Sequence, residues 1–523
     1  MKIKLAIIFF VITILISSTI LSAKTTKNSI NTSDENVEWT IMLYLDGDNN
    51  LESYAIEDFL EIAAVGSTDN VNIIIQFDRR GGYDYSFGDW TSCKRYFVLK
   101  NMEPIYENAV MDVGEANMGD PQALVDFTTW TMENFPANKY SLIFWDHGTG
   151  WKEEPTTKNV CQDDTNGDVL DLYEIQMALN QITGGGVYKL EHIGFDACLM
   201  GMIEVAYELK DYANFMTFSE ETEPADGWNY YDALNNLIKN PVNYDGEKLG
   251  ESFVTYYSGY GITLSTINLG LINEVKNAVN NFTNKLMNQE FKVTINNAIK
   301  IVQTFDDYDY VDLYDFAKII QADIYDLEMD NKAQELMDSI NIAVTSEHHD
   351  SCNPDSHGLS IYLPYYYYLE DYENLLFSHD SVWNDFIIWF MYGDQTSSPP
   401  TDPIISGEKQ GDYGNLYTYS FYSEDADGDD ILYYVDWGDY TDVHEIGPKK
   451  SGEIAEKSHI WEASGGYVIK AQAIDINGAR SQWTYYTISM PREKNYNFFY
   501  KLPIFQRIFN SNFFIRFINN ILK

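Results

Sequence analysis

The chain has 523 residues, too many for one ordinary hydrophobic core, so we expect roughly two to four domains. Apolar residues make up 45% of it, which excludes an intrinsically disordered chain. The formal net charge of -46 excludes a nucleic-acid partner, because binding to phosphates requires basic surface. The acid excess instead suits cationic substrates, calcium or solubility at high salt, although a solvated acidic surface accounts for most of it.

The first residues have the layout of a secretory signal peptide. Lys2 and Lys4 precede an apolar run over residues 5–21, and the small residues Ser22 and Ala23 follow. Cleavage after Ala23 would give a secreted or cell-surface protein with residues 1–23 removed. The run is nearly long enough to span a bilayer, so an uncleaved anchor is the alternative.

Strand and helix patterns alternate after residues 24–37, which we interpret as a linker or short pro-segment. Ile41 to Leu45 and Val71 to Phe77 are apolar runs typical of buried strands. Leu51 to Ala64 and Gln122 to Phe135 have the spacing of amphipathic helices. Strands separated by helices predict an α/β fold, with a parallel sheet covered by helices on both faces.

Two further apolar runs end abruptly on reactive residues. The run from Ser141 leads into His147, and the run from His192 leads into Cys198. In an open parallel sheet such strand ends lie at one edge, where sites form. A thiol and an imidazole placed there have the parts needed for covalent acyl transfer. The sequence therefore predicts a cysteine hydrolase with His147 and Cys198 as its catalytic residues.

The backbone N–H groups of Gly148 and Cys198 are expected to stabilise the oxyanion formed on attack. Taken alone, His147 would be interpreted as a structural histidine and Cys198 as a buried small residue, since free cysteines are more often buried than reactive. Their joint occurrence at two strand ends reverses that interpretation. We interpret His192 and His357 as structural.

Several segments, in this order, resemble the clostripain family of cysteine peptidases, relatives of caspases, legumains and gingipains. They are Trp39–Leu51, Trp145–Trp151, Asp196–Met200, Ser219–Glu221, Glu223–Trp228 and His357–Pro364. The separation of about 50 residues between the histidine and the cysteine is also that of caspases. The resemblance implies a caspase-like α/β/α sandwich over residues 38–395, and a cysteine endopeptidase that needs no cofactor for its chemistry.

The resemblance also implies a substrate class, since clostripain-like enzymes cleave after basic residues. Asp196 and Asp226 match the family positions of the carboxylates that pair with the Arg or Lys side chain of the substrate. A strand-end cap is the alternative role for Asp196. Family members are commonly cleaved between the two catalytic strands, and Lys152 and Lys158 are candidate sites in the polar segment 149–171. An ordinary exposed loop is the equal alternative there.

A proline-rich linker at residues 396–402 marks the next boundary. Beyond it, residues 403–490 alternate short strand patterns with Gly and Asp turns. The segments Asp425–Asp429 and Val435–Asp439 resemble a PKD or related immunoglobulin-like module, although Tyr440 stands where that family usually has Gly. We therefore expect a C-terminal all-β immunoglobulin-like domain.

The tail at residues 491–523 is amphipathic, and it is basic, without acidic residues, from Asn495 onward. Such a tail either contacts a membrane or the cell envelope or packs on the acidic surface of its own protein. The N-terminal segment, if it is not cleaved, is a second candidate for membrane contact.

Two acidic turns, Asp163–Asp168 and Asp425–Asp430, crowd oxygen ligands of the kind that Ca²⁺ prefers. Neither has the twelve-residue spacing of an EF-hand. Ca²⁺ binding is therefore one interpretation of these turns, and an ordinary acidic turn without a metal is the alternative. Cys93, Cys161 and Cys352 allow one disulfide in an exported protein, with Cys198 left reduced.

Two functional hypotheses follow. The first is an exported cysteine endopeptidase that acts on protein or peptide substrates with basic residues. The second is a catalytically inactive cell-surface or adhesion protein that uses its PKD-like module. The presence of both His147 and Cys198 favours the enzyme, because a retired enzyme would be free to lose them.

Overall fold

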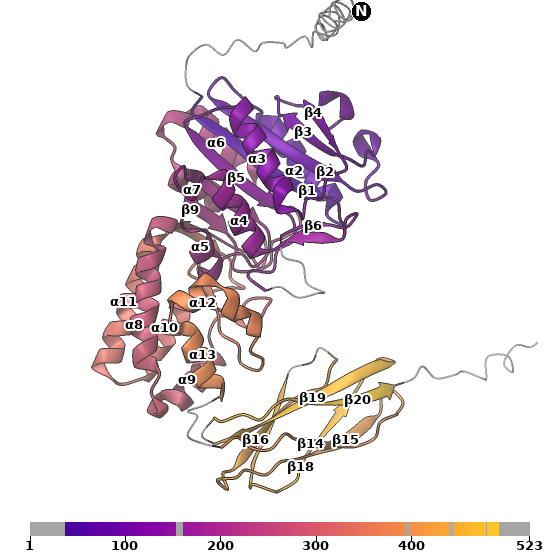
Figure 1. The fold of residues 1–523 in the computed structure, drawn as a ribbon, viewed down its shortest axis with the longest axis vertical. Helices are drawn as coiled ribbons and strands as arrows, with labels where there is room; N and C mark the ends of the chain where they lie inside the picture. Colours follow the sequence, from indigo (N-terminus) through magenta and orange to yellow (C-terminus); the bar gives the residue numbers. More distant parts are fainter. Residues whose placement is uncertain are drawn as a thin grey trace, which may run out of the picture.

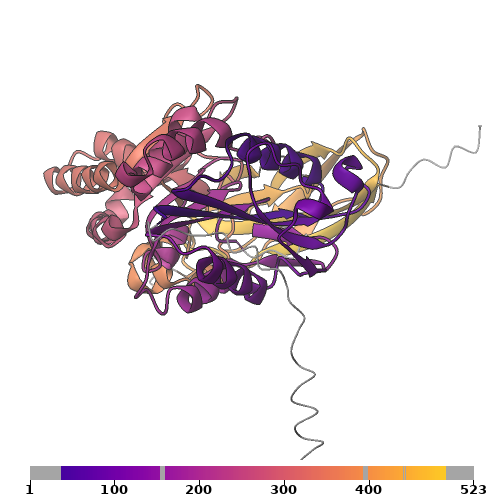
Figure 2. The same cartoon turned by 90° about the horizontal axis from the view of Figure 1, so that it is seen from above.

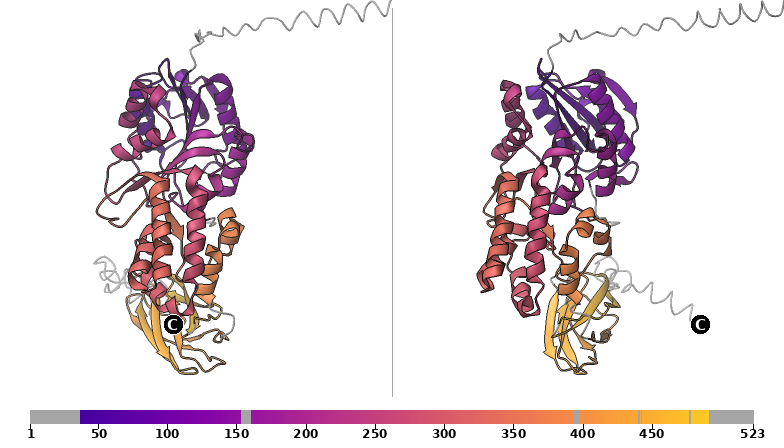
Figure 3. Two further views of the ribbon diagram at one scale, coloured as in Figure 1. Left: turned by 90° about the vertical axis from the view of Figure 1, so that its left-hand side faces the viewer. Right: turned by 60° about the vertical axis from the view of Figure 1, so that its left-hand side comes forward.

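The computed structural model describes residues 37–152, 160–392 and 398–490, apart from Tyr440, Asp442 and Asn477. An α/β part, a helical part and a β-sandwich follow one another along the molecule (Figure 1 and Figure 3). The expected signal segment, Lys158 and the basic tail lie outside the described residues. Within the residues described, no helix is long and apolar enough to cross a bilayer.

A mixed β-sheet with a parallel centre organises the α/β part. The central strands lie in the order β9 (Ala213–Phe218), β8 (Leu190–Asp196), β5 (Lys139–Trp145), β1 (Trp39–Gly47) and β2 (Val71–Arg79). Antiparallel strands extend both edges, with β10 (Thr263–Asn268) and β12 (Val344–His349) beside β9, and β3 (Cys93–Phe97) and β4 (Met111–Gly114) beside β2. The parallel centre brings the carboxyl ends of β5 and β8 to the same edge.

Successive side chains of β1 enter opposite hydrophobic cores, as the two-residue period of a strand requires. Ile41 and Leu43 pack under α2 (Glu52–Val65), α6 (Tyr230–Lys239) and α7 (Gly246–Tyr256). Met42 and Tyr44 pack on the other face under α3 (Pro121–Asn134), α4 (Leu172–Ile182) and α5 (Ile203–Leu209). Helices therefore cover both faces of the sheet (Figure 2). Burial on both faces explains why these strands are continuous apolar runs. The predicted α/β/α sandwich is confirmed.

Side-chain caps set where the helices before and after β5 begin. Asp120 accepts a hydrogen bond from the N–H of Gln122 over 2.8 Å, and Pro121 occupies the first position of α3. Asp171 and Glu174 form a reciprocal capping box at the start of α4. Each cap contributes about 1 kcal/mol, and the second one fixes where the segment between the two catalytic strands re-enters a helix.

The helical part extends the α/β part rather than forming a separate core. It contains α8 (Ile272–Leu286), α9 (Lys292–Ile299), α10 (Leu313–Asp323), α11 (Leu327–Ala343), α12 (Leu376–Asp380) and α13 (Trp383–Tyr392). Its apolar faces share one hydrophobic core with α3, α4 and α5. At the junction, β11 (Tyr310–Asp312) pairs with β13 (Ser360–Tyr362), and Ser360 bridges to Met202 just before α5.

The C-terminal part is a β-sandwich of two antiparallel sheets. One contains β14 (Ile404–Ser406), β15 (Leu416–Tyr422) and β18 (Ala455–Ile460). The other contains β17 (His444–Lys449), β16 (Ile431–Asp436), β19 (Gly465–Asp475) and β20 (Thr484–Met490). Phe421, Trp437 and Trp461 fill the core between the sheets. The predicted all-β immunoglobulin-like domain is confirmed.

The segment 149–171 departs from the expectation of an exposed loop. Within it, β6 (Val160–Asp163) and β7 (Asp168–Leu170) form a hairpin, and every residue of β6 is buried. The expectation was wrong for this part because the polar side chains form hydrogen bonds within the protein and so do not need water. The Asp163 carboxylate, for example, accepts hydrogen bonds from two backbone N–H groups.

The four cysteines, all within the described residues, are free thiols. Cys93 and Cys161 are buried, Cys198 is partly buried and Cys352 is exposed. The disulfide that the sequence allowed is therefore not formed. Burial raises the pKa of the Cys93 and Cys161 thiols well above their ordinary value, so these two behave as small apolar side chains.

His192 on β8 gives the fold a testable dependence on pH. It is fully buried, with the Ser141 and Thr217 hydroxyls each 2.9 Å from a ring nitrogen, and burial lowers its pKa to about 3. In the unfolded chain the imidazole has its ordinary pKa of 6.5, so below that pH the unfolded state binds a proton that the folded state does not. The free energy of unfolding therefore decreases as the pH falls below 6.5. From pH 7 to pH 5, wild type should lose about 2 kcal/mol more than His192→Gln. Urea unfolding measures both, and equal losses would contradict the buried neutral ring.

Candidate active site

Two reactive side chains are carried by the ends of neighbouring parallel strands. β5 and β8 pair with Trp145 opposite Asp196, and His147 and Cys198 each follow that pair by two residues. The N–H of Asp146 donates to the carbonyl of Asp196 over 3.2 Å, which extends the pairing beyond the strands. The two predicted catalytic residues therefore leave the sheet at the same level.

Gly148 rests directly on the peptide group of Cys198. A Cβ atom at position 148 would overlap the Cys198 carbonyl oxygen and lie 2.9 Å from the Cys198 nitrogen, so a larger residue would push the two loops apart. Among the hydrogen bonds of the described residues, neither the Gly148 nor the Cys198 N–H is used as a donor. Both groups predicted to bind the oxyanion are thus close together.

Asn50 orients the imidazole of His147. Its Oδ1 lies 3.1 Å from Nε2, and because that oxygen only accepts, Nε2 carries the proton in this contact. The adjacent Asn49 donates to the Asp146 carboxylate over 2.7 Å and to the Gln162 carbonyl over 3.0 Å. Asp146 also accepts from the N–H of Gln162. These bonds join the histidine loop, the turn after β1 and β6 in one network.

The thiol of Cys198 lies beside the turn that follows β9. Glu223 donates its backbone N–H to the sulfur over 3.2 Å. Burial raises the pKa of Cys198, the Glu223 N–H opposes that rise, and carboxylates including those of Asp196 and Glu221 add to it. The thiol is therefore protonated at neutral pH and needs a base when it attacks.

Two carboxyl groups lie buried near the thiol. Asp196 is 4% exposed and accepts from the Tyr230 hydroxyl over 2.7 Å and from the Trp228 N–H over 3.3 Å. Burial raises the pKa of Asp196 to about 6 and that of Glu223 well above its ordinary value. Both oxygens of Glu223 are buried without a hydrogen-bond partner among the described residues, and the neighbouring Asp196 carboxylate adds to the rise that burial causes in its pKa. We call Asp196 and Glu223 the acid pair, and a cation beside them would favour their ionised forms.

Asp226 is exposed on the turn that carries Glu223 and that packs against Asp196 at the end of β8. The N–H of Gly227 donates to Pro224 over 2.9 Å and closes the turn. Gly227 has a φ of +58°, and a Cβ there would meet the carboxylates of Asp58 and Asp196 at 3.0–3.2 Å. The structure thus places both predicted substrate-binding residues in one wall, with Asp196 inside it and Asp226 at its surface.

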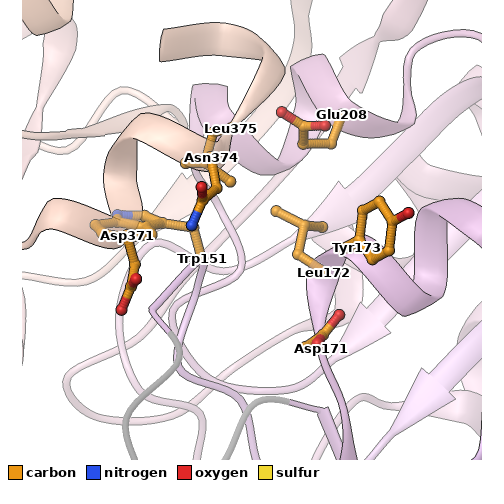
Figure 4. A pocket seen from close by; sticks show the side chains of 8 residues that line it. All are labelled: Trp151, Asp171, Leu172, Tyr173, Glu208, Asp371, Asn374 and Leu375. Carbon is orange, nitrogen blue, oxygen red and sulfur yellow. The ribbon is translucent and has the colours of Figure 1, made fainter.

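A shallow depression of about 460 Å³ adjoins this wall. Its lining residues are Glu221, Thr222, Glu223, Pro224, Tyr260, Gly261, Cys352 and Asn353. A more enclosed cavity of about 340 Å³ lies elsewhere, between α4, α5 and the segment Asp371–Leu375 that precedes α12, and neither catalytic candidate lines it (Figure 4). The depression, whose Glu223 contacts the thiol, is the better candidate for the substrate.

Sequence reasoning missed two residues of this site. Asn50 and Glu223 stand inside the recognised segments, but neither was singled out. Their roles depend on contacts with His147 and Asp196, which belong to other segments. The only signal in the sequence was their position beside residues that had already been assigned.

A sequence model of the clostripain family matches residues 43–389 of this chain. The chain belongs to that family. Clostripain from Hathewaya histolytica is 28% identical over 404 residues, which cover 63% of this chain and 75% of that protein. The protein is accordingly a cysteine-type endopeptidase.

A solved structure shares the fold of the peptidase part. A secreted C11 cysteine protease from Bacteroides thetaiotaomicron, in complex with an irreversible peptide inhibitor, aligns with a TM-score of 0.51 at 19% identity. The match covers 66% of this chain and 99% of that one. The PKD domain of an M14-like peptidase from a Thermoplasmatales archaeon is 40% identical, with a TM-score of 0.18, and covers 18% of this chain and 100% of that one.

Lys152, one of the two candidate positions for an activating cut in this clostripain-family enzyme, is held in place. It is 9% exposed, and its Nζ lies 2.5 Å from Asp307 and 3.3 Å from Asp309. The side chain would have to leave both carboxylates before it could enter a protease's specificity pocket. The other candidate, Lys158, lies outside the described residues.

One group of carboxylates near the catalytic loops has the composition of a hard-cation site. Oxygens of Asp48, Glu115 and Asp163 lie within 4.8 Å of one another. Buried oxygens of Asp46, Asp48 and Asp78 have no hydrogen-bond partner, which leaves lone pairs directed into the interior. Only Asp163 belongs to an acidic turn that the sequence suggested, and the other residues come from distant segments.

A second group, Asp425, Asp427 and Asp429, lies in the β-sandwich. One oxygen of Asp425 accepts from the N–H groups of Asp427 and Asp429 over 2.9 and 3.0 Å, and the other oxygen is buried without a partner. These hydrogen bonds show that the turn is partly satisfied without a metal ion.

The raised pKa of Cys198 predicts the pH dependence of its alkylation. Only the thiolate reacts, so the rate with iodoacetamide should keep rising through pH 9. The rate constant should be measured in Cys352→Ser, which removes the exposed thiol, with Cys198 followed by peptide mapping. A plateau between pH 5 and pH 7 would instead reveal a preformed thiolate–imidazolium pair.

Proposed function

We propose that this protein is an exported endopeptidase that cleaves peptide bonds after Arg or Lys, with His147 and Cys198 as its catalytic pair. The registered pairing of β5 and β8, which presents the imidazole and the thiol at one edge of the sheet, carries the proposal. The close contact between Gly148 and the Cys198 peptide supports it, because it leaves two N–H groups beside the reacting sulfur.

The chemistry follows from these positions. The sulfur of Cys198 attacks the substrate carbonyl carbon, and its proton passes to the imidazole of His147. The N–H groups of Gly148 and Cys198 stabilise the oxyanion. The C–N bond then breaks as the imidazolium protonates the departing amine. Water, deprotonated by His147, hydrolyses the thioester and restores the thiol.

The acidic wall supports specificity for Arg or Lys. A basic side chain entering beside Cys198 would meet Asp226 at the surface and the Asp196–Glu223 acid pair behind it. Its charge would favour the ionised forms of these buried carboxyl groups, whose pKa values burial raises, so it would gain charge-assisted hydrogen bonds. The peptide inhibitor bound to the Bacteroides protease is consistent with a peptide substrate here.

The alternative is a catalytically inactive cell-surface protein that binds partners through its PKD-like domain. The contacts around His147 and Cys198 favour the enzyme. Gly148 packs on the nucleophile's own peptide group, and Asn50 orients the imidazole, features that a purely structural α/β domain does not require.

Export and the domain division are part of the same proposal. The signal-like residues 1–23 and the secreted relative from Bacteroides support export. We divide the rest into a linker (24–37), the peptidase domain (38–395), a proline-rich linker (396–402), the PKD-like domain (403–490) and the basic tail (491–523). Contact of the tail with a membrane or the cell envelope belongs to this proposal.

Substitutions in the wall test the specificity. Cys198→Ala should abolish cleavage of fluorogenic peptides ending in Arg, Lys or Asp. Asp226→Asn and Glu223→Gln should lower kcat/KM for the Arg and Lys peptides by about 10- to 100-fold, because each removes a charge-assisted contact. Glu274→Gln, on the exposed face of α8, is the matched control and should not change kcat/KM. Equal cleavage after Asp and Arg, or activity in Cys198→Ala, would refute the proposal.

We also propose that Ca²⁺ binds Asp48, Glu115 and Asp163 without taking part in the chemistry. All three offer hard oxygen ligands, and a divalent cation would relieve the repulsion that helps raise the pKa of Asp48 to about 6. The N–H of Asp164 donates to the Asp48 carbonyl over 2.9 Å, so the site would join the turn that carries Asn50 to β6. Bound Ca²⁺ would thus stabilise the orientation of the histidine loop.

Thermal unfolding with Ca²⁺ or with a chelator tests this site. Ca²⁺ at about 100 times its Kd should raise the Tm by roughly 3–8 °C, since binding to the folded state alone adds about 2.7 kcal/mol. Asp48→Asn should remove most of the shift, whereas Asp425→Asn, in the second acidic group, should retain it. An undiminished shift in Asp48→Asn would place the cation elsewhere.

A further inference from the structure

The segment Tyr365–Tyr368, which follows β13, lies against the β-sandwich. The Tyr365 hydroxyl donates to Glu445 over 2.7 Å, and the Tyr367 hydroxyl donates to Asp436 over 2.9 Å. The ring of Tyr367 stacks on Trp483 with 4.5 Å between centroids. Specific hydrogen bonds and stacked rings therefore hold this tyrosine segment to the C-terminal domain.

Arg480 reinforces the contact from the sandwich side. It is 8% exposed, its guanidinium lies 5.2 Å from the centroid of the Tyr434 ring, and it donates to the Tyr365 carbonyl over 3.5 Å. Tyr434 and Ile474 belong to the same hydrophobic core as the helices of the peptidase. A buried cation and a continuous core distinguish this interface from a loosely tethered domain.

The tyrosine segment is joined on its other side to the loop before β11. The N–H of Leu363 donates to the Asp309 carbonyl over 2.7 Å, and the backbone N–H of Tyr365 lies beside the Asp309 carboxylate, where it opposes the rise that burial causes in the pKa of that group. Asp309 and Asp307 together hold the ammonium group of Lys152. One aspartate thus contacts both the tyrosine segment and the chain that follows the catalytic histidine.

That chain is held at a second point. The Tyr310 hydroxyl donates to the Thr149 carbonyl over 2.7 Å, and the Lys152 ammonium lies 4.9 Å from the centroid of the Tyr310 ring. Gly150 has a φ of +72°, and a Cβ there would collide with Met202 and Tyr310. Residues 149–152, which begin two positions after His147, are therefore clamped by the loop before β11.

We propose that Lys152, Asp309 and Tyr365 are positioning residues that couple the β-sandwich to the loop of the catalytic histidine. Loss of the sandwich contact loosens Tyr365, then Asp309, then Lys152, and the imidazole moves relative to the substrate. Displacement of a catalytic group by about 1 Å can cost up to roughly 100-fold in rate, so a distant contact has a measurable effect. The PKD-like domain is then part of the catalytic unit. This inference rests on the proposed roles of His147 and Cys198.

Steady-state kinetics of the full-length protein test the coupling. Arg480→Met breaks the contact from the sandwich side, and Asp309→Asn breaks it beside the histidine loop. Each should lower kcat for an Arg peptide by about 10-fold with KM changed less than about 2-fold, because the histidine and not the specificity wall is displaced. Lys450→Met, which removes an exposed cation of the same sandwich, is the matched control and should keep the wild-type kcat.

The double variant distinguishes coupling from independent damage. If one line of contacts connects the two positions, Arg480→Met with Asp309→Asn should lose little more activity than the worse single variant. Losses that multiply, or a wild-type kcat in Arg480→Met, would overturn the coupling. If Arg480→Met does not fold, Tyr365→Phe replaces it, because that substitution removes only a hydroxyl. Its expected fall in kcat is smaller, and KM should again be almost unchanged. Losses that multiply with Asp309→Asn, or a wild-type kcat in Tyr365→Phe, would overturn the coupling.

A conservative pair at position 152 completes the test. Lys152→Arg retains a cation for Asp307 and Asp309 and should preserve kcat, whereas Lys152→Met should lower it as Asp309→Asn does. Equal kcat in both variants would overturn the positioning role. Failure of the proposed function gives a different result, since either the wild type would then not cleave the Arg peptide or Cys198→Ala would cleave it as well, whatever these variants do.

Discussion

In a parallel pair of strands both chains run in the same direction, so residues at one register position leave the sheet at the same level. Because Trp145 is opposite Asp196, His147 and Cys198 emerge side by side. The absent side chain of Gly148 then allows the two loops to touch. Every other feature of the site is arranged around this contact: Asn50 orients the ring, Glu223 donates to the sulfur, and the acid pair lies near the thiol.

Buried carboxyl groups recur wherever this chain joins distant segments. Asp196 and Glu223 lie close together near the thiol, and Asp46, Asp48 and Asp78 crowd the ends of β1 and β2. Glu220, whose pKa burial raises well above its ordinary value, accepts from the Gly358 N–H over 2.9 Å and from the Ser356 hydroxyl. Such groups are costly unless they are protonated, hydrogen-bonded or bound to a cation, and the chain uses at least the first two of these solutions.

The interface with the β-sandwich gives the tyrosine-rich segment after β13 a structural reason. Tyrosine supplies a large apolar ring for the shared core and a hydroxyl for the polar rim, so one residue type satisfies both sides of the boundary. Tyr365 uses its ring against Tyr434, its hydroxyl on Glu445 and its carbonyl on Arg480, and its N–H lies beside Asp309. Three kinds of contact at one residue explain how a domain outside the catalytic sheet can act on the histidine loop.

The sequence by itself determined the elements whose signal is local. Burial on both faces makes β1, β2, β5 and β8 continuous apolar runs, and abrupt ends mark His147 and Cys198. Turn residues between short strands indicated the β-sandwich. Only the tertiary structure decided that β6 is buried, that Asn50 faces His147, that Glu223 lies beside Asp196, and that Asp163 meets Asp48 and Glu115. These contacts join residues far apart in the chain, and no periodicity or composition within one segment records which distant segment will lie against it.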